Sequence, residues 1–476
     1  MQNIVMKFGG TSVAGAERIA GVVGIARDFF VGALPAQRAS EADRRLVIVV
    51  SAFSGVTDAL IQAARSAAKR DEQTFRQVAQ DLRQKHWTTI EALIPFGDRQ
   101  ASLRAEVEAL VSSFENLCRA ITILGELTPR GQDAVVSLGE RLSARITAAA
   151  LAERGIPSQA VEATGLIVTD DCFGQATPQM EATRQKSRSV LLPLLEQNIV
   201  PVVTGFIGAT AEGVTSTLGR GGSDYTGAIL GSCLDSDEIW IWTDVNGVLT
   251  ADPRIVPEAH TLPRISYNEA AELAYFGGKV LHPKTMLPAM ERNIPIRILN
   301  TFEPQHPGTL VVAGNGNGRT VKAITTIRDL SQVTVEGHGM MGVPGIAAKV
   351  FSAVAQEGIS VLMISQASSE QSICFVVRQQ DSARAITALE RIFELERVRH
   401  NVDRIWAQGD VAIVAVVGAG MRGTPGIGAK VFGALGQRGI NVITVAQGSS
   451  EYNISLVVSQ GDAHNAVRAI HQEFEL

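Results

Sequence analysis

Two short segments each combine a pair of glycines with a fixed positive charge, and both could bind an anion. Lys7 stands in MKFGGTS and Arg220 in GRGGSD. Glycines at the start of a helix expose backbone amides, which bind phosphate oxygens together with a neighbouring cation. Either segment alone could be an ordinary tight turn with a capping Ser or Asp. Because both occur between strand and helix patterns of one region, together they favour an anionic, phosphate-bearing substrate.

The elements around these turns alternate between strand and helix. Strands are predicted at NIVMKF, LVIVVSAF, IVPVVTGFIGAT (199–210) and EIWIWTDV, and helices over 19–30, 137–155 and 223–234. The charged stretch 28–45 is predicted to be an inserted loop, and residues 62–130 to be polar helices. Such alternation predicts a mainly parallel sheet with helices on both faces, a three-layer αβα architecture.

The C-terminal third contains an internal repeat. The segment 343–377 recurs at 424–458, 81 residues later, with somewhat over half of its positions identical. Each copy has the order of a small ferredoxin-like βαββαβ unit. We therefore predict one domain at 1–312, a Gly/Asn-rich linker at 313–319, and two repeat domains at 320–400 and 401–476. The pattern leaves open whether the two repeats intertwine.

Composition and charge exclude several classes of function. With 43 basic and 48 acidic residues, the chain has no positive field to attract nucleic acid. It has no apolar run of the roughly 20 residues that span a bilayer, and no export signal, so we predict a cytoplasmic location without membrane partners. The four cysteines form no C-x-x-C pair, and we predict reduced thiols and no protein-held metal.

Each repeat begins with a glycine pattern that resembles a dinucleotide fingerprint, GHGMMG and GAGMRG. A nicotinamide site needs a helix that starts at the third glycine and an acidic residue about 20 positions later. Here a Pro-Gly step intervenes, and the following strand ends in Gln366 or Gln447. We therefore interpret these glycines as loops of the repeats rather than as a cofactor site.

Four motifs in order, KFGGTSV, GRGGSDYT, WTDVNGVLTADPR and FGGKVLHP, resemble the aspartate kinases of the amino-acid-kinase family. The resemblance covers essentially the whole chain, because those enzymes also carry two C-terminal ACT domains. The segments SQASSEQSICF and AQGSSEYNIS resemble the kinase half of bifunctional aspartate kinase–homoserine dehydrogenases most. Whether this chain is naturally monofunctional or half of such an enzyme is left open.

The resemblance implies transfer of the ATP γ-phosphoryl group to the side-chain carboxylate of L-aspartate, giving 4-phospho-L-aspartate. This is the first step of lysine, threonine and methionine biosynthesis. It needs ATP with Mg²⁺ and no tightly bound cofactor. The acceptor carboxylate is already ionised at neutral pH, since its pKa is about 3.9, so no strong general base is required. Positioning and charge neutralisation should supply most of the acceleration.

The resemblance also assigns residues to the nucleotide. The expected nucleotide-site residues are Lys7, Gly9, Gly10, Thr11, Thr243, Asp244, Arg254 and Lys279. Lys7 neutralises the transferring phosphate, Lys279 approaches the phosphates from the opposite side, and Asp224 completes the catalytic set. Relatives place a tyrosine near the adenine where this chain has Leu249, so any contact from that ring is lost.

A second set is expected to bind aspartate: Ser51, Thr57, Glu140, Arg220, Gly221, Gly222, Ser223 and Asp224. The forked Arg220 clamps the α-carboxylate, while Glu140 and Asp224 receive the α-ammonium. Alternatives remain for several of them. Asp224 could be only a helix N-cap, and Glu140 an exposed helix partner of Arg141 or Arg145. The hydroxyls of Ser51, Thr57 and Thr243 could be ordinary strand-end groups.

Gln366 and Gln447 occupy equivalent positions in the two repeats, each before a Ser-Ser-Glu turn. A side-chain amide can donate to a carboxylate and accept from an ammonium, which suits a free amino acid. The resemblance implies feedback inhibition by threonine at these positions, with lysine or both as the alternative, and a homodimer or higher oligomer through the ACT domains. Each glutamine could instead only close a local turn.

Three other functions fit the sequence less well. A different amino-acid kinase, acting on glutamate, carbamate or a nucleoside monophosphate, would share the fold but lack the pairing of KFGGTSV with two ACT-like repeats. An amino-acid sensor with an inactive kinase domain is opposed by the presence of Lys7, Asp224 and Lys279. A nicotinamide oxidoreductase is the least favoured.

Overall fold

A computed structural model describes residues 2–35, 44–277, 281–314, 319–449 and 451–476. The chain forms two compact units. The first contains Met1–Val248, Thr261–Tyr267 and Val280–Gly314, and the second contains Leu249–His260, Asn268–Lys279 and Asn315–Leu476. The middle of the predicted linker, 315–318, lies outside the described residues. The domain limits inferred from the sequence stay a prediction, because the compact units are discontinuous in sequence.

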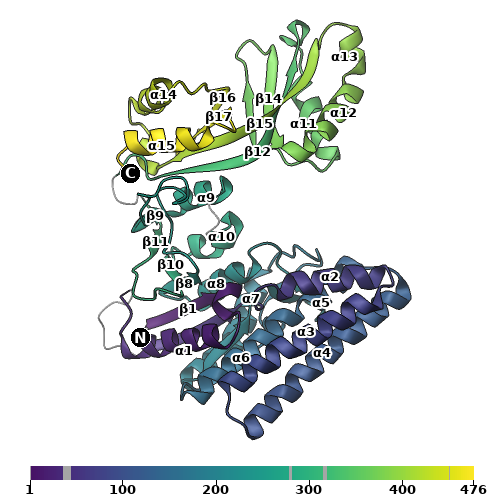
Figure 1. Cartoon of the computed structure of the whole chain (residues 1–476), viewed down its shortest axis with the longest axis vertical. Coiled ribbons are helices and arrows are strands. Elements are labelled where there is room, and N and C mark those ends of the chain that lie inside the picture. Colours follow the sequence, from purple (N-terminus) through teal and green to yellow (C-terminus); the bar gives the residue numbers. More distant parts are fainter. Residues whose placement is uncertain (1, 36–43, 278–280, 315–318, 450) are drawn as a thin grey trace. The chain divides into compact units, whose positions relative to one another are not determined.

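An eight-stranded sheet forms the centre of the first unit, in the order β3-β5-β2-β1-β8-β10-β11-β9. Figure 1 labels five of these strands, β1, β8, β10, β11 and β9. The strands of the sheet are β1 Gln2–Phe8, β2 Arg44–Val50, β3 Ser158–Val161, β5 Val200–Thr204, β8 Glu238–Thr243, β9 Arg264–Ser266, β10 Ile296–Asn300 and β11 Thr309–Val312. All their described pairings are parallel except that between β10 and β11. The predicted mainly parallel α/β fold is confirmed.

Helices bury both faces of this sheet. Alternate residues of β1 point to opposite sides, so that Ile4 and Met6 join one hydrophobic core and Val5 joins the other. The helices of the unit are α1 Ala16–Val31, α2 Val56–Ala68, α3 Glu72–Leu93, α4 Asp98–Leu124, α5 Pro129–Val136, α6 Leu138–Glu153, α7 Met180–Glu196, α8 Gly222–Cys233 and α10 Pro283–Glu291. A strand covered on both faces is apolar throughout, which explains LVIVVSAF.

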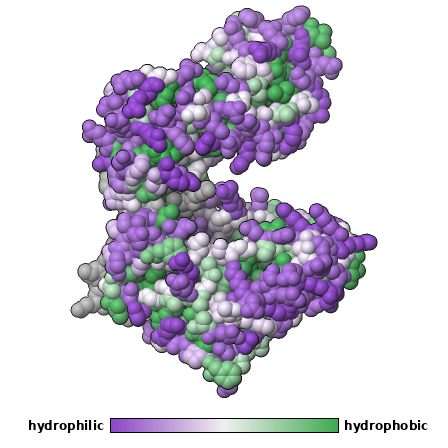
Figure 2. All heavy atoms as spheres, viewed as in Figure 1, coloured by the Kyte–Doolittle hydropathy of each residue, from purple (hydrophilic) through white to green (hydrophobic). Residues whose placement is uncertain are grey.

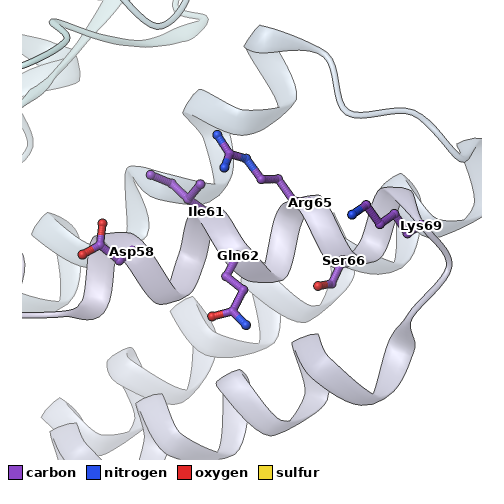
Figure 3. Close-up of a pocket in the computed structure, with 6 residues that line it drawn as sticks. All are labelled: Asp58, Ile61, Gln62, Arg65, Ser66 and Lys69. Atoms are coloured by element: carbon purple, nitrogen blue, oxygen red, sulfur yellow. The ribbon is translucent and has the colours of Figure 1, made fainter. Parts of the chain in front are cut away.

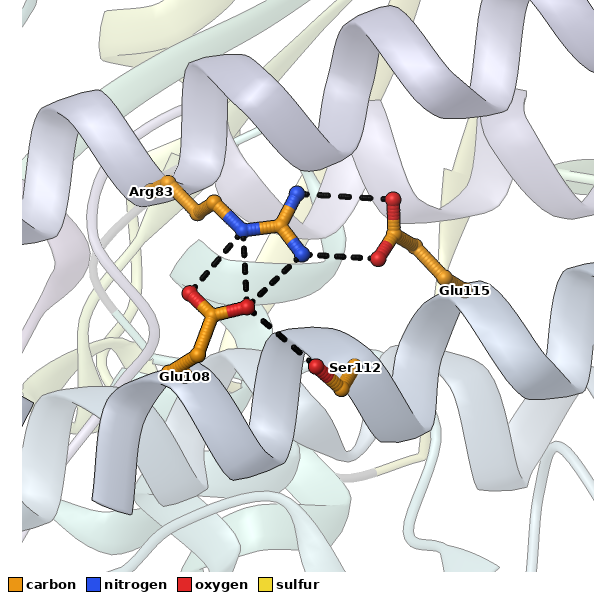
Figure 4. Close-up of polar contacts among 4 residues, drawn as sticks. All are labelled: Arg83, Glu108, Ser112 and Glu115. Atoms are coloured by element: carbon orange, nitrogen blue, oxygen red, sulfur yellow. Dashed lines mark hydrogen bonds and ion pairs between the residues drawn. The ribbon is translucent and has the colours of Figure 1, made fainter. Parts of the chain in front are cut away.

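The region predicted as polar helices contains the long pair α3 and α4. The guanidinium of Arg83 on α3 donates to Glu108 and Glu115 on α4, with its Nη2 at 2.9 Å and 2.7 Å from the two carboxylates (Figure 4). Ser112 donates to the same Glu108 oxygen. The two carboxylates raise the pKa of Arg83. This network links the two helices through one forked cation.

Two predicted boundaries are wrong. The single strand expected at 199–210 is split into β5 and β6 (Ile207–Thr210), which belong to different sheets. Phe206 turns the chain between them with a φ of 69°, a conformation that the local pattern of apolar residues does not reveal. With β4 (Val168–Thr169) and β7 (Thr215–Thr217), β6 forms a small separate sheet. The loop expected from residue 28 begins later, because α1 continues to Val31.

The second unit contains a six-stranded antiparallel sheet in the order β13-β14-β12-β15-β17-β16. Its strands are β12 Ala323–Glu336, β13 Met363–Gln366, β14 Ser372–Arg378, β15 Arg404–Val417, β16 Thr444–Gln447 and β17 Asn453–Ser459. Its helices are α9 Tyr267–Tyr275, α11 Ile346–Gln356, α12 Ser382–Ile392, α13 Glu394–Val398, α14 Ile427–Gln437 and α15 Ala463–Glu473, the first residue of α9 belonging to the first unit.

The two repeats intertwine by exchanging strand halves. Residues 330–336 of β12 pair with β14, whereas 323–327 pair with 413–417 of β15. We call the first lobe the second half of β12, α11, β13, β14, α12, α13 and the first half of β15. The second lobe is the second half of β15, α14, β16, β17, α15 and the first half of β12. Each lobe is a βαββαβ unit completed by the other repeat's strand, which confirms the ferredoxin-like architecture.

The fingerprint-like glycines allow this exchange. A Cβ at Gly337 would lie 2.3 Å from the Asn401 carbonyl oxygen, and one at Gly418 would lie 2.3 Å from that of Thr320. Helix α11 begins at Ile346, after Gly345, rather than at the third glycine of the pattern. These glycines therefore permit close approach of neighbouring strands.

None of the described helices has the length and hydrophobicity that crossing a bilayer requires. Hydrophilic side chains predominate on the face of each unit that is visible in Figure 2. The four cysteines are free.

The packing of α6 yields the first prediction. A Cβ at Gly139 would lie 2.7 Å from Cβ of Ala52, which cannot rotate away. We expect Gly139→Ala to lower the free energy of unfolding by about 1–3 kcal/mol, measured by denaturant titration. Gly24→Ala is the matched control. A Cβ at Gly24, inside α1, would meet no atom within 4 Å, so alanine there should stabilise by about 0.5–1 kcal/mol. Equal effects of the two substitutions would contradict this account.

Candidate functional site

A cavity of about 680 Å³ lies at the carboxyl ends of β1 and β2 and the start of α8. Parallel sheets bind ligands at this edge, because their loops converge there. Ten residues predicted from the sequence line the cavity: Lys7, Gly10, Ser51, Thr57, Glu140, Arg220, Gly221, Gly222, Ser223 and Asp224. The structure therefore brings together every residue expected to bind aspartate.

Lys7 and Asp224 form an ion pair in this cavity. Lys7 is near the end of β1 and only 8 % exposed, and its Nζ lies 2.6 Å from Oδ1 of Asp224. Asp224 is the third residue of α8, whose N-cap is Gly221 in the left-handed region with a φ of 73°. The alternative that Asp224 serves only as an N-cap is therefore wrong. A cation and a carboxylate are held together at the floor of the cavity.

Glu140 presents a buried carboxyl group to the cavity. It is 3 % exposed, and its Oε1 accepts the Ala52 N–H at 3.1 Å. Its Oε2 has no hydrogen-bond partner among the described residues. Burial raises the pKa of Glu140 to about 8. The alternative of an exposed partner of Arg141 or Arg145 is wrong, because both arginines pair with Glu162.

The loop before α8 presents Arg220 and then packs tightly. Arg220 is exposed and lines the cavity without an ion pair to any residue in the described ranges. A Cβ at Gly222 would lie 2.6 Å from the Phe206 ring, and one at Gly205 would lie 2.7 Å from Cβ of Ser223. Close backbone packing thus fixes the loop while the Arg220 guanidinium stays accessible to an anion.

The first glycine turn differs from the expected helix N-terminus. The N–H of Gly9 donates to the Trp242 carbonyl at 3.2 Å, so this amide is already used. A short 3₁₀ turn follows over Gly10–Val13, and α1 begins only at Ala16. Thr11 is exposed in this turn. Among the predicted glycine-loop residues, Gly10 and Thr11 remain the candidates for phosphate contact.

The other nucleotide-site residues are only partly assembled. Thr243 ends β8, which pairs with β1, and its hydroxyl donates to Asp244 at 3.2 Å. Both residues therefore lie at the same sheet edge as Lys7. Arg254 belongs to the second unit, where it pairs with Asp252 at 2.6 Å. Lys279 lies outside the described residues.

Sequence reasoning missed Asp133, which lines the same cavity and is 1 % exposed. Its carboxylate accepts from the Gly174 N–H at 2.8 Å and from the N–H and hydroxyl of Thr217 at 2.9 Å and 2.8 Å. It therefore ties three separate segments to the cavity wall. The sequence offered no signal for it, because Asp133 precedes the helix predicted over 137–155 and lies on α5, whereas Glu140 lies on α6.

The loop 51–55 is supported from α3. Lys85 donates to the Ser54 carbonyl at 2.7 Å, and the His86 ring stacks on Phe53 with centroids 4.7 Å apart. Burial lowers the pKa of His86 to about 4, so the ring is neutral at physiological pH. Helix α3 thus braces the loop that forms one wall of the cavity.

A second hollow of about 400 Å³ lies along α2 (Figure 3). It shares Asp58 and Ile61 with the first cavity, and its other lining residues are Gln62, Arg65, Ser66 and Lys69. None of them belongs to the predicted set. The cavity at the sheet edge therefore remains the candidate site. Within the described ranges, no cluster of three or more His, Cys, Asp or Glu is arranged to hold a metal ion.

Each lobe of the second unit has a pocket beside its predicted glutamine. Gln366 lines a pocket of about 290 Å³ in the first lobe, and Gln447 lines one of about 370 Å³ in the second. In each lobe the glutamate of the Ser-Ser-Glu turn accepts an N–H of the glycine loop: Glu370 from Gly342, and Glu451 from Gly423. The predicted equivalence of the two glutamines is confirmed by their places at the ends of β13 and β16.

The chain matches two families. The amino acid kinase family matches residues 2–300, and the ACT domain matches 333–393 and 414–474. The resemblance inferred from the four motifs is confirmed by these matches.

Individual relatives agree with them. The chain is 38 % identical to the maize chloroplastic bifunctional aspartokinase/homoserine dehydrogenase 1, over 99 % of this chain and 50 % of that protein. It thus spans about half the length of the bifunctional relatives that it matches. It is 35 % identical to Arabidopsis chloroplastic aspartokinase 3, over 99 % and 81 %. Escherichia coli aspartokinase III, solved with aspartate and ADP (R-state), superposes with a TM-score of 0.80 at 30 % identity, covering 100 % of both chains. Its T-state, with lysine and aspartate, gives 0.78.

The buried Glu140 yields a prediction of pH-dependent stability. Its pKa is about 8 in the folded protein, whereas an unfolded glutamate titrates near about 4.3, so between these values the folded state holds one more proton. Stability should therefore fall as pH rises through this range, by at most about 1.4 kcal/mol per pH unit. Glu140→Gln should remove this contribution, measured as the difference in unfolding free energy between parent and variant from about pH 5.5 to about pH 8.5.

The exposed Glu126 provides the control for this measurement. Glu126→Gln should leave the pH profile of the parent unchanged, because the carboxyl group is in water in both states. A parent–variant difference for Glu140→Gln that is the same at both ends of the pH range would refute the assignment.

Proposed function

Because the chain belongs to the amino acid kinase family, and within it to the aspartokinases, we propose that it transfers the γ-phosphoryl group of ATP to the side-chain carboxylate of L-aspartate, forming 4-phospho-L-aspartate and ADP. The observation that carries this proposal is the Lys7–Asp224 ion pair in a cavity that also holds buried Glu140 and exposed Arg220. These groups offer cations for two anions and carboxylates for one ammonium. Aspartate and a nucleotide phosphate together present that charge pattern.

The cationic and the anionic side chains of the cavity bind different groups of aspartate. The Arg220 fork clamps the α-carboxylate, while Glu140 and Asp224 accept from the α-ammonium. The buried Oε2 of Glu140, which has no hydrogen-bond partner among the described residues, then gains one. Since a nearby positive charge favours the carboxylate form, Glu140 releases its proton when the ammonium arrives. Ser51 and Thr57, from the braced loop and α2, orient the acceptor.

The chemical step joins two negatively charged groups. A side-chain oxygen of aspartate forms a bond to the γ-phosphorus, and the bond from that phosphorus to the bridging oxygen breaks, so that ADP leaves with the electron pair. Lys7 neutralises charge on the transferring oxygens, and Asp224 holds its ammonium in position before the nucleotide binds. Gly10 and Thr11 offer amides, Thr243 and Asp244 line the nucleotide, and Arg254 and Lys279 complete the set. Mg²⁺ arrives with ATP, bound to its phosphates.

We also propose feedback control by an amino acid in the two ACT pockets. Gln366 and Gln447 contact its charged ends, with threonine favoured. Lysine is the alternative, supported by the T-state of Escherichia coli aspartokinase III, which contains lysine. Assembly into a homodimer or higher oligomer through the ACT domains and a cytoplasmic location belong to the same proposal.

Trapping with hydroxylamine tests the proposed reaction. With aspartate and Mg-ATP, we expect an acyl hydroxamate that is absent with glutamate. Arg220→Lys should raise KM for aspartate by about tenfold or more and change KM for ATP little, because a single ammonium replaces the fork. Arg119→Lys, at an exposed site on α4, should leave both constants unchanged. No hydroxamate from the parent, or equal effects of the two substitutions, would refute the proposal.

The regulatory proposal predicts a separation between inhibition and turnover. Gln447→Ala should raise the inhibitor concentration for half-maximal effect by about tenfold, since hydrogen bonds to a charged ligand are lost. Turnover without inhibitor should stay nearly unchanged. Gln437→Ala, at an exposed site on α14, should behave as the parent. The curves are recorded with L-threonine, L-lysine and both, and coinciding curves for parent and Gln447→Ala would contradict the assignment.

A further inference from the structure

The strand exchange makes Asp403 and Lys322 equivalent residues of the two lobes. The Asp403 N–H donates to the Glu336 carbonyl, and the Lys322 N–H donates to that of Val417, each at 2.8 Å. Glu336 ends β12 and Val417 ends β15, and each is followed by the first glycine of its fingerprint-like loop. The residues next to Asp403 and Lys322 also approach those glycines in the same way. The same backbone position therefore carries a carboxylate in one lobe and an ammonium in the other.

This difference changes how the two pocket loops are held. In the first lobe, the N–H of His338 donates to Asp403 at 3.0 Å, so the lobe caps its own loop. The equivalent N–H in the second lobe belongs to Ala419, and lysine cannot accept it. Instead, Ala419 donates to Oε1 of Glu269 at 2.7 Å. The acceptor in the second lobe is thus supplied from outside the repeat.

Lys322 holds that outside acceptor in place. Its Nζ lies 2.8 Å from Oε2 of Glu269, and the two side chains are 2 % and 0 % exposed. A buried carboxylate must be paired and hydrogen-bonded, and the ammonium of Lys322 together with the Ala419 N–H meets this requirement. The lysine at 322 therefore cannot cap the loop itself, but it pairs with the carboxylate of Glu269 that does.

Glu269 lies on α9, a helix whose first residue belongs to the first unit. Helix α9 begins at Tyr267, a residue of the first unit whose hydroxyl donates to the Ile294 carbonyl of that unit. Glu269 follows two residues later, in the second unit. Ala419, which donates its N–H to Glu269, is the first residue of the loop that follows β15. Met421 and Gly423 of this loop line the second lobe's pocket. One short path of covalent and hydrogen bonds therefore leads from this pocket to α9.

We infer that Glu269, held by Lys322, is a positioning residue that couples the second lobe's pocket to the first unit through α9. In the described part of the first lobe, the equivalent cap is Asp403, which belongs to the lobe itself. An amino acid bound at the second pocket changes the first unit only if it favours one arrangement of this link over another. The inference rests on the proposed function, which supplies the effector and the activity that it controls.

Two double variants with uncharged side chains at 269 and 322 test the link. Both remove the buried ion pair, but they place the hydrogen-bond acceptor for the Ala419 N–H on different residues. Glu269→Leu with Lys322→Asn moves an amide acceptor to the position that Asp403 holds in the first lobe. Glu269→Gln with Lys322→Met keeps the acceptor on α9. Both variants replace the two charged side chains together, so neither 269 nor 322 keeps a buried charge without the other. Asp403→Ala removes the equivalent cap from the first lobe and leaves α9 untouched.

Binding of labelled L-threonine and L-lysine is measured by equilibrium dialysis, and inhibition by the hydroxamate assay. We expect Glu269→Leu with Lys322→Asn to bind the effector within about threefold of the parent but to need about tenfold more for inhibition. Glu269→Gln with Lys322→Met, and Asp403→Ala, should be inhibited as the parent is. Hydrogen exchange should show that the effector slows exchange in both α9 and the 418–428 loop of the parent, but only in the loop of the Leu/Asn variant.

Each other outcome has one meaning. Parent-like inhibition and parent-like slowing at α9 in the Leu/Asn variant overturn the coupling, as does an equal loss in both double variants. A parent that forms no hydroxamate overturns the proposed kinase activity. The effect of the amino acid on hydrogen exchange in α9 still tests the coupling in that case. A parent that binds neither amino acid overturns the regulatory proposal and this inference together.

Discussion

The candidate site depends on the ion pair between Lys7 and Asp224, which lies where a parallel sheet can hold charge. Both faces of the sheet are buried by helices, so its carboxyl edge is the place where a charged side chain of β1 can meet water or ligand. The pair also requires α8 to lie close to the strand. A Cβ at Gly227 would already touch Cβ of Lys7 at 3.4 Å, and one at Gly231 would lie 2.5 Å from Ile239. Small residues on α8 therefore set the distance on which the pair depends.

The loop 51–55, which forms one wall of the cavity, is supported by three helices in turn. Glu140 holds the Ala52 N–H from α6, while Lys85 holds the Ser54 carbonyl from α3. Helix α3 is in turn fixed to α4 through Arg83. Helices α3 and α4, which carry none of the predicted site residues, thus have a structural role in the site. A short loop at a cavity needs such support, because its own backbone groups are few.

The second unit shows how two repeats can differ in one loop contact without losing their common fold. Exchange of strand halves joins both lobes into one sheet, and the glycines at the crossing points allow the backbones to approach. Within this nearly symmetric frame, the residue whose N–H bonds to the last carbonyl of β12 or β15 is aspartate at 403 but lysine at 322. That single difference decides whether a lobe caps its own loop or takes its acceptor from α9. The shared fold gives each lobe a pocket, and the difference between the lobes places a contact with α9 beside only the second pocket among the described residues.

The sequence by itself determined the fold class and the repeat, because apolar periodicity is local. Its four motifs, through their resemblance to aspartate kinases, also supplied most of the residues of the cavity. Lys7 and Asp224 could thus be placed together from motifs far apart in the chain. Only the tertiary structure decided the rest. The turn at Phe206 and the buried bonds of Asp133 depend on neighbours distant in sequence. The place of Glu269 depends on a strand exchange that equates two positions with different side chains, and no local pattern records such a contact.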